Sequence, residues 1–561
     1  MFPAMSNTHQ STNRESTDVL SLAELALLLS AVAIGVYLRL EPVGAALLFG
    51  DELHTLRTLD KGYAYLLTTN SSTGSGMLLP LVQRVLADGF GLNHWTIRAP
   101  AYVGGLGLLV CMYPLGRRLV GARAAVLATL MLAFNSSLIF YSHIGRSYAL
   151  MAWLGLVLVY NLQRIIDGDG ASRHHVYTAM LIGLLPYVHL TSIGLVLTVS
   201  VGSMAVLVWE ARHREAAKLG LALGLGLVVA ALLYAPAFTS LQAFVSEKSS
   251  RTYEGTFGVL DVAALLVGSR GGAILSIPLL AVALSFHGWR GRWRSLPLVL
   301  ACIAPVLAIV LIRPFGGPYA YARYAIAMLP FAFLFLGSLF ADPFPDSSNA
   351  TVSRARPLLG LAGVTFAIAL FLLGPGGRGV PDGPHANTYI SMFPLPAFDI
   401  PWSGGSAFYS QLEQEEGSIR IIEAPALVSR SRHLYRNQYL QHEKETWLAL
   451  FPYELDTPPD GPYVSLASRG WRTRANADYL ILHLKVREEI TEYWSFVYDT
   501  NRNLANEQNV AAFMERQRRY TWLPKPETLP KLQQSLLEEL GEPTYRDEWL
   551  WVWDLRKIGG E

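Results

Sequence analysis

The chain has 561 residues, of which 52% are hydrophobic and only 16% are charged, and its mean hydropathy is +0.30. Soluble domains carry about 25% charged residues, so this composition excludes an ordinary soluble enzyme and predicts a membrane protein. The formal net charge of +2 gives no sign of a nucleic-acid partner. The two cysteines, Cys111 and Cys302, lie inside apolar runs without the spacing of metal ligands.

The N-terminal part contains one polar segment and one apolar run. Residues 1–19 are polar and rich in Ser, Thr and Asn, so we expect a disordered cytoplasmic N-terminus. The apolar run 20–40 has no clear small-residue cleavage site after it. This favours a retained membrane span over a signal peptide.

Apolar runs recur along the first two thirds of the chain. A transmembrane helix needs about 20 mainly apolar residues, and eleven runs are candidates, some of them short. The candidates are 20–40, 100–118, 121–141, 147–166, 176–189, 191–209, 217–237, 271–287, 296–312, 322–341 and 357–374. Together they predict an α-helical polytopic membrane domain over 20–374, with 41–99 as its first outer loop.

The stretch 176–209 decides the parity of the spans. The sequence Pro-Tyr-Val-His over 186–189 interrupts it, which favours two short spans. A single long span here would move every later loop to the opposite side of the membrane.

The basic residues test this topology independently. With a cytoplasmic N-terminus, every second connection should carry an excess of Lys and Arg. The connections that do so contain Arg117 and Arg118, Arg164 and Arg173, Arg212, Arg214 and Lys218, Arg290, Arg292 and Arg294, and Arg354 and Arg356. We therefore expect the loops 41–99, 142–146, 238–270 and 313–321, with the C-terminal part, on the extracytoplasmic face of the inner (plasma) membrane.

The last third of the chain has a different composition. Residues 375–405 are dense in Pro and Gly, and strand-like and helix-like segments alternate after them. The strand-like runs are 419–422, 479–482 and 549–554, and the helix-like segments are 433–450, 505–519 and 528–540. This alternation predicts a small extracytoplasmic α/β domain within 375–561. No Gly-rich phosphate loop opens any of its helices, so a nucleotide site there is unsupported.

An acidic pair, Asp51-Glu52, lies in the predicted first outer loop, shortly beyond the first span. Ionisable residues beside membrane spans are costly, so each of them needs a reason. A carboxylate at this place can act as a base on a lipid-borne substrate at the membrane surface. The alternative is structural, because an acidic residue also caps the N-terminus of a helix, and 53–67 has a helical pattern.

Arginines beside aromatic residues occur in two further outer segments. Arg146 lies in the turn Tyr-Ser-His-Ile-Gly-Arg-Ser-Tyr over 141–148, and Arg313 and Arg323 lie within 313–324. A guanidinium group can hold a phosphate with two parallel hydrogen bonds. The alternative is that these arginines snorkel to an interface where Tyr is common. His189, close to Tyr187 between two short spans, is either a substrate contact or a packing residue.

Carboxylates and arginines on one face of the membrane indicate an enzyme. Sugar transfer from a phospholipid needs a base for the acceptor proton and cations for the charge of the leaving phosphate. A transporter or flippase of lipid-linked glycans is the alternative function. It predicts inverted repeats and interrupted helices that meet at the membrane midplane, whereas the sequence shows no repeat and its ionisable residues gather at one face.

Four motifs carry a resemblance to a known family. They are Asp51-Glu52, the sequence Asn-His-Trp-Thr-Ile-Arg-Ala-Pro over 93–100, the turn 141–148, and Arg-Tyr-Ala-Ile-Ala-Met-Leu-Pro over 323–330. In this order and on this membrane side, they resemble motifs of the C-type (GT-C) glycosyltransferase superfamily. The resemblance covers about residues 20–375. It is greatest to bacterial relatives of protein O-mannosyltransferases and of the lipid A aminoarabinose transferase.

The resemblance implies an integral membrane glycosyltransferase. Its donor would be a polyprenyl-phosphate sugar carrying a hexose or pentose, and its acceptor a glycan, lipid or protein of the cell envelope. It implies Asp51 as the general base, with Glu52 beside it. We expect no cofactor and no resident metal, although parts of the wider superfamily use a divalent cation at such an acidic pair.

The remaining candidate site residues follow the same motifs. The predicted donor-phosphate residues are Arg57, Arg146, Arg313 and Arg323, and the predicted substrate contacts are His143, Tyr148, His189 and Tyr324. One segment departs from the family pattern. Relatives often have His-Pro-Pro-Leu after the acidic motif, whereas this chain has Ser-Gly-Met-Leu-Leu-Pro over 75–80. The donor pocket is expected to differ there.

Overall fold

The computed structural model consists of two compact units. The residues that it describes are 20–40, 52, 58–59, 61–70, 76–169, 171–250, 259–289, 293–312, 318–341, 350–373, 406–425, 442, 444–450, 463–466, 470–485 and 528–558. The first unit holds most of the chain up to residue 380. The second holds the C-terminal part together with 44–56 and 87–96.

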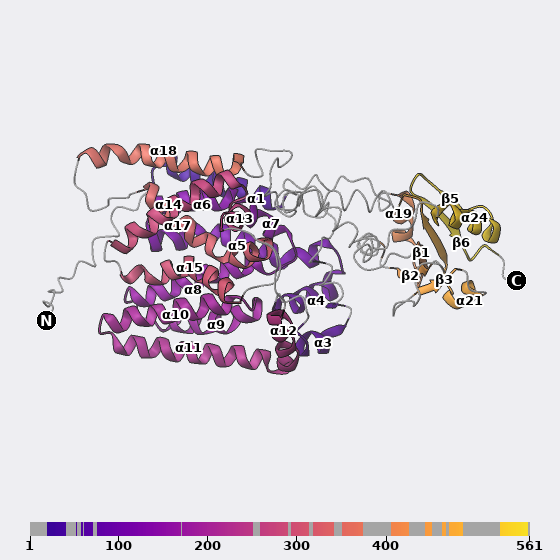
Figure 1. Cartoon of the computed structure of the whole chain (residues 1–561), viewed down its shortest axis with the longest axis horizontal. Helices are drawn as coiled ribbons and strands as arrows, with labels where there is room; N and C mark the ends of the chain where they lie inside the picture. The colour runs from indigo at the N-terminus through magenta and orange to yellow at the C-terminus, as the bar shows by residue number, and fades with distance from the viewer. Residues whose placement is uncertain are drawn as a thin grey trace. The chain divides into compact units, whose positions relative to one another are not determined.

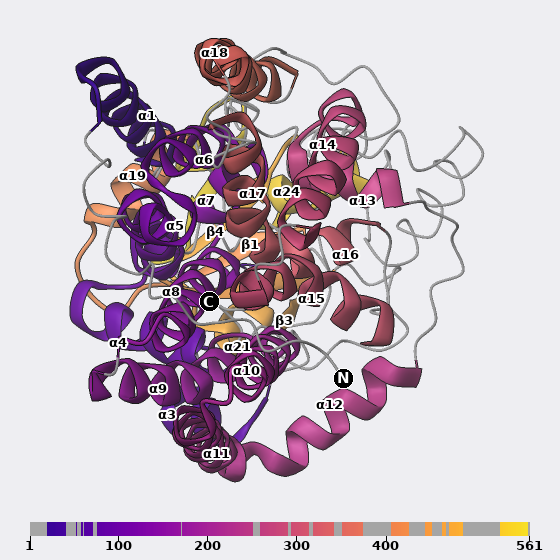
Figure 2. The same ribbon diagram turned by 90° about the vertical axis from the view of Figure 1, so that its left-hand side faces the viewer.

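The first unit is helical throughout its described part. Its long helices run side by side along one direction in Figure 1, and Figure 2 shows them end on. The helices are α1 (Leu22–Leu40), α3 (Gly62–Thr68), α4 (Leu78–Phe90), α5 (His94–Val120), α6 (Ala122–Phe134), α7 (Ser136–His143), α8 (Tyr148–Ile166), α9 (Ser172–Val188), α10 (Ser192–Trp209), α11 (His213–Tyr234), α12 (Phe238–Ser250), α13 (Val259–Val267), α14 (Arg270–Trp289), α15 (Leu296–Ile312), α16 (Pro318–Ala325), α17 (Leu329–Ala341) and α18 (Ala350–Leu373).

Each of the eleven predicted apolar runs overlaps a helix of this bundle. Within the described residues, six helices are long and apolar enough to cross a membrane, or seven if α6 and α7, bent by 58° at their junction, form one span. Helix α9 has 17 residues, and the apolar parts of α14, α15 and α18 are also short. The chain is therefore a multi-pass membrane protein, and the count of eleven spans stays a prediction.

The predicted break near Pro186 is present. Helix α9 ends at Val188, α10 begins at Ser192, and the two helices contact each other. Proline has no N–H to donate, which weakens the last turn of α9. The Tyr234 hydroxyl donates to the Pro186 carbonyl at 2.8 Å. It thereby satisfies one of the carbonyls that a helix end leaves open.

Charged side chains join the loops at one end of the bundle. Arg212 donates to the last carbonyls of α8, at Ile166 and, over 2.9 Å, at Ile165. Arg294 pairs with Glu210 at 2.5 Å. These bonds bring three of the predicted basic connections together.

Helix α8 has 19 residues and so spans about 28 Å, close to the thickness of a bilayer core of about 30 Å.

The second unit contains a six-stranded sheet in the order β3-β2-β1-β4-β6-β5. The strands are β1 (Arg420–Ala424), β2 (Glu445–Leu450), β3 (Tyr463–Ser465), β4 (Tyr479–His483), β5 (Tyr545–Arg546) and β6 (Leu550–Asp554). The first four in the sheet order are parallel, and β6 and β5 are antiparallel additions at the edge. This arrangement confirms the predicted α/β class.

Helices cover both faces of this sheet. Trp471 of α21 (Trp471–Ala475) and Leu532 of α24 (Thr528–Leu540) pack with Ile422 on one face. Phe408 of α19 (Ala407–Gln414) packs with Ile421 on the other. Neighbouring residues of β1 thus face opposite cores, as strand geometry requires. Both faces of the parallel part are therefore buried.

One predicted element of this unit is wrong and another is confirmed. Residues 445–450 form β2, although 433–450 has a helix-like pattern; residues 433–441 and 443 of that prediction lie outside the described residues. Thr446 and Trp447 favour strands, and pairing with β1 overrides the local helical pattern. The helix over 528–540 is present as predicted. The segment 505–519 lies outside the described residues.

A buried polar network crosses the sheet of the second unit. Tyr409 donates to both carboxylate oxygens of Glu423, at 3.0 and 3.1 Å, and His483 pairs with the same carboxylate. His442 stacks on Tyr409, with 12° between the rings, and burial lowers the pKa of His442 to about 4. The buried Glu423 carboxyl group thus has hydrogen-bond partners, which offsets the cost of its burial.

Candidate functional site

Arg146 lies in a tight turn between α7 and α8, and two glycines of α5 let this turn approach closely. A Cβ at Gly104 would lie 2.4 Å from the backbone nitrogen of Leu150, and one at Gly105 would lie 2.0 Å from Ser142 Oγ. Any side chain at these positions would displace the turn, since such contacts are far inside van der Waals distance. The Gly-Gly sequence therefore positions both sides of the Arg146 turn.

Helix α4 holds the same turn from a second direction. Gln83 is fully buried, and its amide nitrogen donates to the carbonyls of Ile97 at 2.6 Å and of Gly145 at 3.4 Å. The Gly145 carbonyl belongs to the peptide group that precedes Arg146. The backbone at Arg146 is thus fixed from α4 as well as from α5.

His189 lies in the turn between α9 and α10 and is fully buried. Its backbone N–H donates to Leu185, and its carbonyl accepts from the Ser192 N–H, each over 2.9 Å. The ring nitrogen Nδ1 lies 2.7 Å from Thr191 Oγ1. Among the described residues, the other ring nitrogen, Nε2, has no hydrogen-bond partner. An unsatisfied buried polar atom costs about 1–3 kcal/mol, so this atom marks a candidate ligand contact.

Arg323 and Tyr324 come from α16. The Arg323 guanidinium lies over the Tyr324 ring, 5.0 Å from its centroid, and donates to the Tyr324 hydroxyl at 3.3 Å. Stacking on an aromatic face orients a guanidinium group.

Helix α13 connects the junction between α6 and α7 to helix α16. At this junction, Asn135 donates to the Leu266 carbonyl at 2.9 Å and Ser137 donates to the Leu265 carbonyl at 2.5 Å. These carbonyls belong to the last turn of α13, where no N–H group of the same helix is left to donate to them. Helix α13 in turn packs on α16. The bend at Asn135 thus helps to place Arg323.

The turn before α8, the turn between α9 and α10, and helix α16 bring five predicted residues together. We call these five residues the arginine–ring cluster. Its members are Arg146, Tyr148, His189, Arg323 and Tyr324. The ring of His189 lies 5.0 Å from that of Tyr148 and 5.7 Å from that of Tyr324. The two tyrosine rings are 6.3 Å apart. The positive charges of Arg146 and Arg323 both act on His189. The cluster is therefore electropositive and suits an anionic group.

The predicted first outer loop reaches the turn that holds His189. The Met77 N–H donates to the Tyr187 carbonyl at 3.0 Å. Gly76 has a φ of +106°, and a Cβ there would lie 2.3 Å from the Val188 carbonyl oxygen. Only glycine fits this backbone conformation and this close approach. Gly76 and Met77, from the segment that departs from the family pattern, therefore pack directly before His189.

The other predicted site residues have different positions. Glu52 is fully buried and belongs to the second compact unit. His143 is buried, and its Nε2 lies 3.1 Å from the Leu38 carbonyl of α1. Asp51, Arg57 and Arg313 lie outside the described residues. Sequence reasoning missed Thr191, Gln83 and Asn135. Of these, Asn135 had a signal, because Asn-Ser inside an apolar run is typical of a helix cap.

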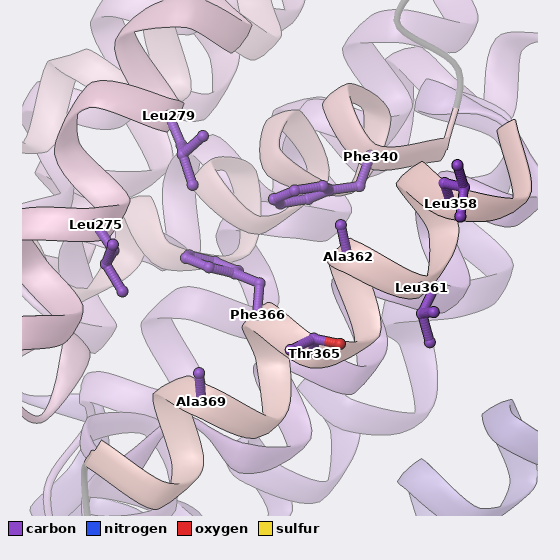
Figure 3. Close-up of a pocket in the computed structure, with 9 residues that line it drawn as sticks. All are labelled: Leu275, Leu279, Phe340, Leu358, Leu361, Ala362, Thr365, Phe366 and Ala369. Atoms are coloured by element: carbon purple, nitrogen blue, oxygen red, sulfur yellow. The ribbon is translucent and has the colours of Figure 1, made fainter. Parts of the chain in front are cut away.

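Within the part of the chain that is described, no group of three His, Cys, Asp or Glu side chains could hold a metal ion. An apolar cavity of about 470 Å³ lies between α14, α17 and α18. Figure 3 shows Leu279, Phe340 and Phe366 among its lining side chains, with Thr365 as the one polar residue labelled. None of its lining residues belongs to the arginine–ring cluster.

The fold is similar to that of solved ArnT structures. ArnT from Cupriavidus metallidurans in the apo state aligns with a TM-score of 0.51 and 15% sequence identity, over 84% of this chain and 94% of that chain. The same protein bound to undecaprenyl phosphate aligns with a TM-score of 0.53 and 15% identity, over the same shares. This likeness shows that the chain has an ArnT-like fold, in agreement with the fold that the motifs predict. No protein-family model and no curated protein sequence matches the chain.

Proposed function

We propose that the chain is a membrane glycosyltransferase that takes a sugar from a polyprenyl-phosphate donor. The observation that carries the proposal is the arginine–ring cluster, in which Arg146 and Arg323 lie near one buried histidine. Its support is chemical as well as structural. A leaving phosphate gains charge as the sugar departs, and preorganised guanidinium groups stabilise that charge. The ArnT fold adds support, since a solved ArnT binds undecaprenyl phosphate.

The acceptor side of the reaction is assigned to the first outer loop. In this proposal the Asp51 carboxylate takes the proton of an acceptor hydroxyl or amine, which then attacks the sugar carbon bonded to phosphate. The phosphate leaves as polyprenyl phosphate between Arg146 and Arg323. The acceptor is an envelope glycan, lipid or protein, and the transferred sugar is a hexose or pentose.

Binding measurements test the donor site directly. The purified full chain in lipid nanodiscs is titrated with undecaprenyl phosphate, with undecaprenol and with inorganic phosphate. We expect undecaprenyl phosphate to bind much more tightly than the other two, because the site combines a cationic cluster with a membrane location. Equal binding of undecaprenol would contradict the phosphate site. Stronger binding of inorganic phosphate would show an anion site that is not specific for lipid.

The proposed membrane orientation can be tested with two engineered cysteines. Ser535 on α24 and Ser172 at the start of α9 are both exposed, and the native Cys111 and Cys302 are first replaced by alanine. Ser535→Cys should react with a membrane-impermeant thiol reagent on intact spheroplasts, because the C-terminal unit is expected outside. Ser172→Cys should react only after lysis. The reverse pattern would place the proposed active site in the cytoplasm.

A further inference from the structure

The two nitrogens of the His189 ring have different environments. Nδ1 lies 2.7 Å from Thr191 Oγ1 and 3.4 Å from the Thr191 backbone nitrogen, whose N–H donates to it. Nε2 is buried and has no hydrogen-bond partner among the described residues. The ring is therefore held on one side only, next to two arginines and two tyrosines.

The Thr191 contacts select one tautomer of this ring. A backbone N–H can only donate, so a proton on Nδ1 would oppose it. The Thr191 hydroxyl has one proton, which can go to His189 Nδ1 at 2.7 Å or to Met151 Sδ at 3.9 Å. Sulfur is the weaker acceptor and the more distant one. Nδ1 thus accepts from Thr191 twice, and the ring proton lies on Nε2.

The surroundings of this ring favour its neutral form. His189 is fully buried, and the positive charges of Arg146 and Arg323 act on it. Two neighbouring cations and the loss of hydration both disfavour a third positive charge. A neutral imidazole with its proton on Nε2 is a hydrogen-bond donor that adds no repulsion between cations.

We propose that His189 donates a hydrogen bond from Nε2 to a phosphate oxygen of the lipid-linked donor, and that Thr191 is the positioning residue that fixes the proton there. This inference rests on the proposed function, because it assigns the donor phosphate to the arginine–ring cluster. The phosphate would then contact a neutral donor as well as the two guanidinium groups. Thr191 itself needs no contact with the substrate.

Nitrogen NMR of histidine-labelled protein tests the tautomer without any substrate. The His189 signal is assigned as the one that disappears in His189→Gln. In the wild-type chain we expect Nε2 to be protonated and Nδ1 unprotonated. Thr191→Val has a similar shape but no hydroxyl, and its His189 signal should show a mixture of both tautomers. Thr191→Ser keeps the hydroxyl and should restore the wild-type signal.

Binding of undecaprenyl phosphate tests the role of the proton on His189 Nε2.

 Loss of one charge-assisted hydrogen bond weakens binding roughly tenfold. His189→Asn removes the donor at the Nε2 position and should show this loss, whereas the longer His189→Gln places an amide N–H near that position and should retain most of the affinity. Thr191→Val should weaken binding by a smaller factor, and Thr191→Ser should recover it.

A matched control separates this effect from general damage to α10. Thr198 lies on the same helix, and among the described residues its hydroxyl bonds to the Gly194 carbonyl alone, at 2.7 Å. Thr198→Val makes the same chemical change away from the cluster and should leave both the His189 signal and the binding constant unchanged.

The outcomes distinguish the inference from the function on which it rests. If the wild-type chain binds undecaprenol as well as undecaprenyl phosphate, the proposed function fails. If the wild-type chain is selective for the phosphate but His189 carries its proton on Nδ1, the inference is wrong and the function stands. The same holds if Thr191→Val keeps the wild-type tautomer and affinity.

Discussion

Replacement of Asp51 by asparagine should reduce sugar transfer by about 100-fold or more, because an amide keeps the shape of the carboxylate but cannot accept the acceptor proton. The measurement is the rate of transfer by the purified chain with a polyprenyl-phosphate sugar. Binding of undecaprenyl phosphate should be nearly unchanged, since the base acts on the acceptor and not on the donor phosphate.

Glu52→Gln is the matched comparison for Asp51→Asn. It makes the same chemical change at the neighbouring residue and should cost less activity. If a divalent cation joins the two carboxylates, both variants should lose activity alike, and a chelator should inactivate the wild-type chain. Transfer by Asp51→Asn at the wild-type rate would rule out Asp51 as the general base.

Arg146→Lys should weaken the binding of undecaprenyl phosphate roughly tenfold. Lysine keeps the positive charge but cannot supply the planar pair of N–H groups that fits a phosphate. Arg146 is 4% exposed, so water cannot replace the hydrogen bond that a lysine there would fail to make. The measurement is the dissociation constant in nanodiscs, with the unfolding temperature as a check on the fold.

Arg123→Lys is the control for this substitution. Arg123 pairs with Glu24 at 2.8 Å and its side chain is 62% exposed, so the change should affect neither binding nor stability measurably. If Arg146→Lys binds the lipid as tightly as the wild-type chain, the phosphate clamp lies elsewhere, and Arg323→Lys is the next variant to measure.

The sequence predicts the helices of the first unit well because apolar runs of sufficient length have few alternatives in a membrane. Each predicted run, including the two halves of 176–209, overlaps a helix. The C-terminal unit was less predictable. Strand β2 has a mixed pattern, and its conformation follows from pairing with β1, which is distant in the sequence.

The candidate site, like the fold, could be predicted from the sequence only in part. Short motifs are sufficient to select Arg146, Tyr148, His189, Arg323 and Tyr324, and the fold brings these five residues together. Two of the residues that position them, Gln83 and Thr191, could not be found by pattern. Gln83 acts through a carbonyl far along the chain, and Thr191 matters only because a histidine ring turns toward it. Such contacts depend on tertiary packing.

The close contact at Gly76 also limits how the predicted first outer loop can be engineered. A reporter peptide inserted between Gly76 and Met77 would have to break the bond from the Met77 N–H to the Tyr187 carbonyl. It would also disturb the backbone directly before His189. The turn at Gly168, between α8 and α9, is a better insertion point, because an added Cβ there meets no atom within 4 Å. Epitope tags and fluorescent fusions should therefore be tolerated at Gly168 and not at Gly76.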